Sequence, residues 1–126
     1  MQDNKLKVGQ IWKYKTRPEE EYSTLTILKV EKNEKDGIIV HIYVDGLKLK
    51  NPHIFNGISE DIKHLPLSEN AVLMCITTLI SENNKLPDFE DGYNSWKTAF
   101  DNNKGGIFNI EVGEVVKYVE QTLNSK

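Results

Sequence analysis

The sequence is poor in cysteine, in arginine and in long apolar runs. Cys75 is its only cysteine, so no disulfide can form within the chain, and a reducing cytosol is the natural compartment. No apolar run approaches the roughly 20 residues that a membrane helix needs. The first residues also lack the hydrophobic segment of a signal peptide. We therefore expect a cytoplasmic protein that does not bind a membrane.

The sequence motifs typical of common enzymes and cofactor sites are absent too. The sequence has no G-x-G-x-x-G or G-x-x-x-x-G-K-[ST] nucleotide motif, no H-E-x-x-H, no G-x-S-x-G and no C-x-x-C. With one cysteine and three histidines, a thiolate-rich zinc site cannot form within one chain. We expect no cofactor. These absences favour a non-enzymatic protein but leave open whether the chain is an enzyme.

The chain has 126 residues and a formal net charge of −3, which suits one soluble domain. Residues 1–63 carry 11 basic and 10 acidic side chains, whereas residues 64–126 carry 5 and 9. Neither half has the Lys/Arg-rich surface of a duplex-binding protein, so we expect no nucleic-acid partner. This difference in charge coincides with a change in the predicted secondary structure, from strand-rich over 1–67 to helix-rich over 68–126.

Alternation with period two predicts strands in the first half of the chain. Asp-Gly pairs at 36–37 and 45–46 provide the positive φ angles that tight turns need. Residues 51–63 lose the alternation and predict an exposed excursion, from which the chain returns near 64–67. The expected strands are 6–16, 22–32, 38–45 and 47–50.

Apolar side chains at helical spacing predict three helices in the second half. Ser68 is a suitable N-cap for a helix over 68–82. An aromatic stripe at Tyr93, Trp96 and Phe100 marks a helix over 93–103, and valines mark another over 112–123. Strands first and helices afterwards predict an α+β fold, with an antiparallel sheet of about four to five strands against about three helices.

His41 is the first candidate for chemistry, on the strand face that also carries Tyr43 and Asp45. Residues four apart on a strand lie about 13 Å apart, so Asp45 cannot bond His41, and a partner must come from a neighbouring strand or loop. A half-buried histidine satisfied by a backbone carbonyl is the simpler interpretation. His41, His53 and His64 match no recurrent ligand spacing, and we expect no metal site.

Arg17 is the second candidate, because it is the one arginine beside fifteen lysines. Lysine can replace arginine wherever a site needs only a positive charge. A single arginine that is retained therefore suggests a site that needs a planar, bidentate guanidinium. Our hypothesis is that Arg17, one of Glu20 or Glu21, and His41 converge at one end of the sheet. The alternative is an ordinary ion pair that braces the turn after Arg17. The candidate binding residues are Arg17, Glu20, Glu21, His41, Tyr43 and Trp96.

Six segments are distinctive in combination, namely Gly9–Tyr14, Thr16–Glu20, Ile39–Ile42, Asp45–Leu47, His64–Ser68 and Tyr93-x-x-Trp96. Together they resemble a family of small bacterial cytosolic proteins whose function is not known. This resemblance implies a bacterial origin and no particular activity. Val8–Trp12 also looks like the first strand of small SH3-like barrels, so the sheet could be curved or form an SH3-like half-barrel, although the later helices depart from that pattern.

Three function classes remain open. The first is a non-enzymatic protein-binding module, for instance an immunity protein that blocks a bacterial toxin, because an inhibitor needs only a complementary surface. The second is a ligand-binding or regulatory domain in which Arg17 grips a carboxylate or phosphate of a small anion. The third is a small hydrolase-type enzyme in which His41 is the acid or base. The sequence favours the first.

Overall fold

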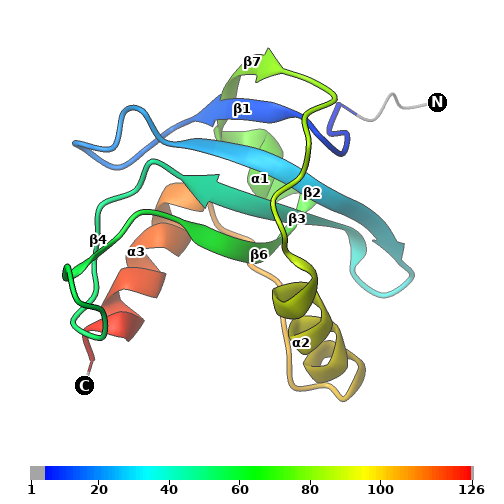
Figure 1. The fold of residues 1–126 in the computed structure, drawn as a ribbon. Coiled ribbons are helices and arrows are strands. Elements are labelled where there is room, and N and C mark those ends of the chain that lie inside the picture. Colours follow the sequence, from blue (N-terminus) through cyan, green and yellow to red (C-terminus); the bar gives the residue numbers. More distant parts are fainter. Residues whose placement is uncertain (1–4, 126) are drawn as a thin grey trace.

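Residues 5–125 form an antiparallel sheet with three helices, as described by a computed structural model (Figure 1). The five-stranded sheet has the order β6-β3-β2-β1-β7, and β4 and β5 form a separate hairpin. The α+β prediction is confirmed. The strands are β1 (Ile11–Tyr14), β2 (Thr24–Asn33), β3 (Gly37–Asp45), β4 (Leu49–Lys50), β5 (Ile58–Ser59), β6 (Ile62–Ser68) and β7 (Ile76–Ser81). The helices are α1 (Glu69–Cys75), α2 (Glu90–Asp101) and α3 (Val112–Leu123).

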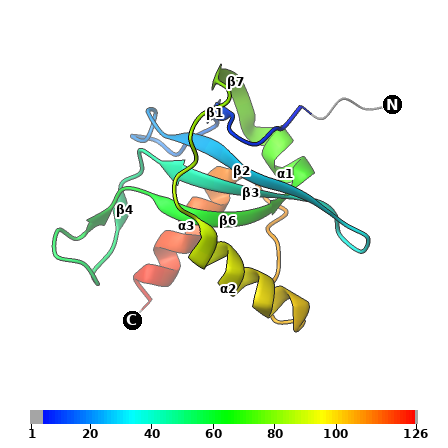
Figure 2. The ribbon, with the colours of Figure 1, turned by 45° about the vertical axis from the view of Figure 1, so that its right-hand side comes forward.

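The helices cover both faces of this sheet. Helices α1 and α3 lie behind it in Figure 1, whereas the segment after β7 crosses its front and leads into α2 (Figures 1 and 2). The main core lies between the sheet and the pair α1 and α3, where Val40, Ile42 and Val116 are fully buried. The part of the chain that the structure describes contains no helix long and apolar enough to cross a membrane.

Strands β2 and β3 lie next to each other inside the sheet and are its two longest strands. Gly37 in the turn between them has φ 78°, which confirms the role expected of the first Asp-Gly pair. Both faces of β3 are covered, because Val40 points into the main core while Ile39 and His41 are buried on the side of α2. The sheet is open, so the SH3-like resemblance does not extend to a closed barrel.

Strand β6 was not predicted, because Lys63, His64 and Pro66 interrupt the apolar alternation. Proline is tolerated here because β6 is an edge strand of the five-stranded sheet. Its outer side is partly covered by Phe108, whose N–H donates to the Pro66 carbonyl and whose carbonyl accepts from the Ser68 N–H. The segment around Phe108 therefore protects this edge.

The helix predicted over 68–82 is wrong beyond Cys75. Ser68 caps α1 as expected, because its hydroxyl accepts the Ala71 N–H at 3.1 Å. Ile76-Thr77-Thr78 then continues as strand β7, which pairs antiparallel with β1. Three consecutive β-branched residues favour a strand, and the free edge of β1 supplies the hydrogen bonds. The helix-like apolar spacing over this segment was coincidental.

The other elements differ from prediction mainly at their ends. Helix α2 begins three residues before Tyr93 and includes Gly92, whereas α3 lies where the valine pattern placed it. The excursion predicted over 51–63 contains the exposed hairpin tip with Phe55, strand β5 and the start of β6, whereas β4 is the end of the strand predicted over 47–50.

Gly46 is the glycine that this backbone most requires. It has φ 70°, and a Cβ at this position would lie 2.8 Å from the Ser23 Cα. We expect Gly46→Ala to lower the free energy of unfolding by about 1–2 kcal/mol, from backbone strain and this backbone contact. Urea denaturation of the variant would measure the loss. Gly37→Ala is the matched control, because a Cβ there meets nothing within 4 Å. A Gly46→Ala variant no less stable than Gly37→Ala would contradict the prediction.

Candidate functional site

Arg17 lies in the loop between β1 and β2 and is held by two carboxylates. Its Nε and Nη2 donate to the two oxygens of Glu20 at 2.8 and 2.7 Å, and its Nη1 donates to Glu120 of α3 at 2.8 Å. The prediction that Arg17 meets Glu20 is confirmed. Glu21 is exposed and accepts only the Glu19 N–H, at 3.3 Å, among the bonds that the structure records for it.

The same carboxylates also bind backbone, so Arg17 is the centre of a structural network. Glu20 accepts the Lys48 N–H and Glu120 accepts the Lys50 N–H, each at 2.7 Å. Burial alone would raise the pKa of Glu20, but the bonds from Arg17 and Lys48 outweigh it and hold this pKa below its ordinary value. The network joins the turn after β1, the start of β4 and α3. This is the ion pair that the sequence left as the alternative to a binding site.

His41 belongs to a different cluster, on the opposite face of the sheet. It is fully buried rather than half-buried, and its partners are two side chains rather than the backbone carbonyl of the simpler interpretation. Both partners come from neighbouring strands, as predicted. Its Nε2 lies 2.6 Å from Glu31 Oε1, and its Nδ1 lies 2.8 Å from His64 Nε2. Arg17 bonds to α3 behind the sheet, whereas His41 lies under α2 in front of it, so the two do not converge.

The donors and acceptors of this cluster can be assigned from its chemistry. An ionised Glu31 only accepts, so His41 donates from Nε2, and its neutral Nδ1 must accept from His64 Nε2. Burial lowers the pKa of His41, and burial together with the neighbouring His41 lowers the pKa of His64 to about 4. Near neutral pH both rings are uncharged. In the chain Glu31–His41–His64, a proton added at His41 Nδ1 would face the His64 Nε2–H donor and break the hydrogen bond between the two rings.

Helix α2 covers this chain with aromatic side chains. Tyr93 and Trp96 contact the His41 ring edge-on, with centroids 4.9 and 4.8 Å away. The Tyr93 hydroxyl also donates to both oxygens of Glu31, at 3.2 and 3.1 Å. Trp96 stacks on Phe100 and donates its Nε1–H to the Gly106 carbonyl. The aromatic stripe therefore attaches α2 to the sheet, and Trp96 has mainly a structural role.

The remaining candidates lie apart from both clusters. Tyr43 donates its hydroxyl to Asp61 at 2.9 Å, and burial together with that carboxylate raises its pKa to about 12. His53 sits on the β4–β5 hairpin, with its Nε2 2.9 Å from the Leu123 carbonyl, away from the other two histidines. Cys75 is buried, and this burial raises the pKa of its thiol. Over residues 5–125 no group of potential ligands is arranged to hold a metal ion.

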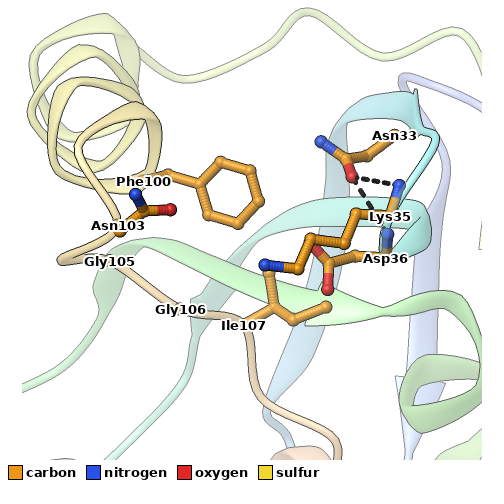
Figure 3. A pocket seen from close by; sticks show the side chains of 8 residues that line it. All are labelled: Asn33, Lys35, Asp36, Phe100, Asn103, Gly105, Gly106 and Ile107. Carbon is orange, nitrogen blue, oxygen red and sulfur yellow. Dashed lines mark hydrogen bonds between the residues drawn. The ribbon is translucent and has the colours of Figure 1, made fainter.

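A hollow of about 320 Å³ lies between the β2–β3 turn and the segment after α2 (Figure 3). The Phe100 ring and the Lys35 side chain face each other across it, and Asp36 lies beside Lys35. The Asn33 side-chain oxygen is already used by the Lys35 and Asp36 N–H groups, each at 2.9 Å. The hollow offers one ammonium beside one carboxylate, which is a weak basis for selecting a small anion.

Exposed apolar side chains gather at the other end of the sheet, around the hairpin. Tyr22 is 92% exposed, and Phe55 at the hairpin tip is fully exposed. Two adjoining hollows, of about 500 and 430 Å³, share Ile58 and run from Tyr22 to Ile54. Both hollows are bordered by carboxylates. We call this region the aromatic–acidic surface; it consists of Tyr22, Asp45, Ile54, Phe55, Ile58, Glu60 and Asp61.

The sequence reasoning missed four of the residues on which the two clusters and the aromatic–acidic surface depend. Glu31 had a detectable signal, because a hairpin that turns at 33–37 sets Lys29 opposite His41 and Glu31 diagonally across from it, which is the register observed. Glu120 had none, because 103 residues separate it from Arg17. No sequence pattern indicated that Tyr22 and Phe55 would be exposed.

Comparisons with family models, with curated proteins and with solved structures found no match for this chain. The resemblance to small bacterial proteins therefore stays a prediction, and the functional argument rests on the geometry described above.

Proposed function

We propose that this chain is a non-enzymatic protein-binding module of the bacterial cytoplasm, of the type that immunity proteins represent. The observation that carries the proposal is the aromatic–acidic surface. Monomeric proteins seldom expose large aromatic side chains in groups, and aromatic anchors dominate the energetics of many interfaces. Tyr22 and Phe55 stand free of the core and so are available to a partner.

The charges around these anchors indicate the chemistry of that partner. The larger hollow is bordered by Asp45, Glu60 and Asp61 against the single Lys48. Lys63 pairs with Asp61 at 3.4 Å, so three carboxylates against two ammonium groups leave an excess of one negative charge. This excess favours a basic protein surface, and such complementarity speeds association and excludes acidic competitors. A toxin with a basic active surface, as needed to act on a polyanion, fits this description.

The alternative, a small anion gripped by Arg17, has weaker support. Every nitrogen of the Arg17 guanidinium already donates to Glu20 or Glu120. An incoming carboxylate or phosphate would have to displace a carboxylate of the protein. The enzyme alternative, with His41 as acid or base, has weaker support as well, because the His41 ring is fully buried and both of its nitrogens are already bonded to Glu31 and His64.

Affinity capture from the native host, followed by calorimetry with the purified partner, tests the proposal. We expect one stoichiometric basic protein, with an affinity that Tyr22→Ala/Phe55→Ala lowers about 100-fold, as two anchors removed together would do. Tyr118→Ala is the control, since Tyr118 is a 55% exposed tyrosine on α3, outside the surface. A stoichiometric partner that binds both variants alike, or no such partner, would overturn the proposal.

A further inference from the structure

The strand β7 forms an edge of the sheet that lacks the usual protection against pairing. Within residues 5–125 it pairs only with β1, so one side of its backbone faces away from the sheet. Four of its six residues are exposed, including Leu79 and Ile80 at 36% and 47%. Natural sheets commonly guard such edges with lysine, proline or a covering segment. The opposite edge has all three, namely Lys63, Pro66 and Phe108.

The absence of charge extends beyond the strand. Residues 70–81 contain no charged side chain, and this is the longest uncharged stretch of a chain that is 28% charged. It covers most of α1 and all of β7, and it exposes Leu73 and Met74 just before the strand begins. An uncharged edge selects an uncharged strand, because a charged one would lose hydration without gaining a counter-ion.

We propose that β7 pairs antiparallel with β7 of a second copy of this chain, so that the two sheets join into one. A two-fold axis perpendicular to the sheet keeps each face on its own side. With this symmetry, an even-numbered residue of one strand lies opposite an even-numbered residue of the other, and an odd-numbered residue opposite an odd-numbered one. Centred on Leu79, the register places the two copies of Leu79 face to face and Ile80 opposite Thr78. The pairing brings no charges together, so β7 is complementary to itself.

The contact involves different residues from the aromatic–acidic surface, so it neither needs nor blocks the partner proposed above. A pair of six-residue strands is small beside a standard interface of roughly 1,600 Å². The dimer should accordingly be weak, with a dissociation constant of the order of 10–100 µM.

Sedimentation of the full chain from about 10 µM to about 1 mM tests the pairing directly, since this range brackets the expected constant. Wild type should shift from monomer to dimer, and Ile80→Lys should weaken the dimer at least ~10-fold by placing an ammonium opposite Thr78, with no counter-ion on the strand. Ile54→Lys, which alters an isoleucine of similar exposure (42%) on the hairpin, should dimerise as wild type does. A wild type that stays monomeric, or a dimer that Ile80→Lys leaves intact, would overturn the proposal.

Hydrogen exchange of wild type provides a second measurement that does not depend on how Ile80→Lys folds. Backbone amides on the outer side of residues 76–81 should gain protection as concentration rises, while amides at the hairpin tip should not. Unchanged exchange over 76–81 in a dimer would show that another surface mediates it, which also overturns the proposal.

Discussion

Arg17→Ala should lower the free energy of unfolding by about 3–5 kcal/mol, as expected when one partner of a buried ion pair is removed. The side chain of Glu20 is only 2% exposed, so its carboxylate would lose two charge-assisted bonds without gaining much water. Glu120 would lose its bond as well, which weakens the attachment of α3. Chemical denaturation at neutral pH measures the loss.

The partner carboxylate offers a matched control for this prediction. Arg17→Ala combined with Glu20→Gln removes the stranded charge while keeping an oxygen that can accept the Lys48 N–H. The double variant should therefore be more stable than Arg17→Ala alone. If the double variant is less stable than Arg17→Ala, or if Arg17→Ala costs under about 1 kcal/mol, the Arg17 network does not stabilise the fold in this way.

Acid should destabilise the protein through the histidine pair, well before most carboxylates titrate. The pKa of His64 is lowered to about 4 in the folded chain, against 6.5 in the unfolded one, so the unfolded chain takes up the proton first. Stability is then complete above pH 6.5 and falls as the pH drops toward 4. A shift of this size corresponds to about 2–3 kcal/mol, and the lowered pKa of His41 acts in the same direction.

Measuring unfolding free energy from pH 7 to pH 4.5 in wild type and His64→Gln isolates this contribution. Glutamine keeps an N–H donor for His41 Nδ1 but cannot take up a proton, so the pH dependence should flatten. His53→Gln, outside the cluster, should keep the wild-type slope. Equal slopes for wild type and His64→Gln would show that the histidine pair does not govern acid stability.

Local patterns were sufficient where the chain folds against its immediate neighbours. The alternation over 38–45, the Ser68 cap and the valine spacing of α3 each describe an element whose stability depends on one buried face. They failed at β7, where an apolar helix-like spacing competed with β-branched residues and the open edge of β1 decided the outcome. Tertiary pairing of this kind leaves no trace in a short window of sequence.

The candidate residues show the same contrast, because contacts between near neighbours in sequence were predicted and contacts between distant strands were not. Arg17 and Glu20, three positions apart, were expected to meet and do. His41 was expected to find a partner on another strand, but that partner is Glu31 rather than a carboxylate of the 19–21 run. His64 completes the cluster from β6, a strand that the sequence did not predict, so its role could not be foreseen.

The pairing of β1 with β7 also sets the order in which the sheet can assemble. Strands β2 and β3 are joined by a tight turn, whereas Trp12 of β1 pairs with Leu79 of β7 far along the chain. Closing so long a loop costs entropy that only an already formed sheet can offset, so β7 should dock late in folding. Until then β1 is the sheet edge, and a chain emerging from the ribosome must keep that edge unpaired until residue 81 has been made.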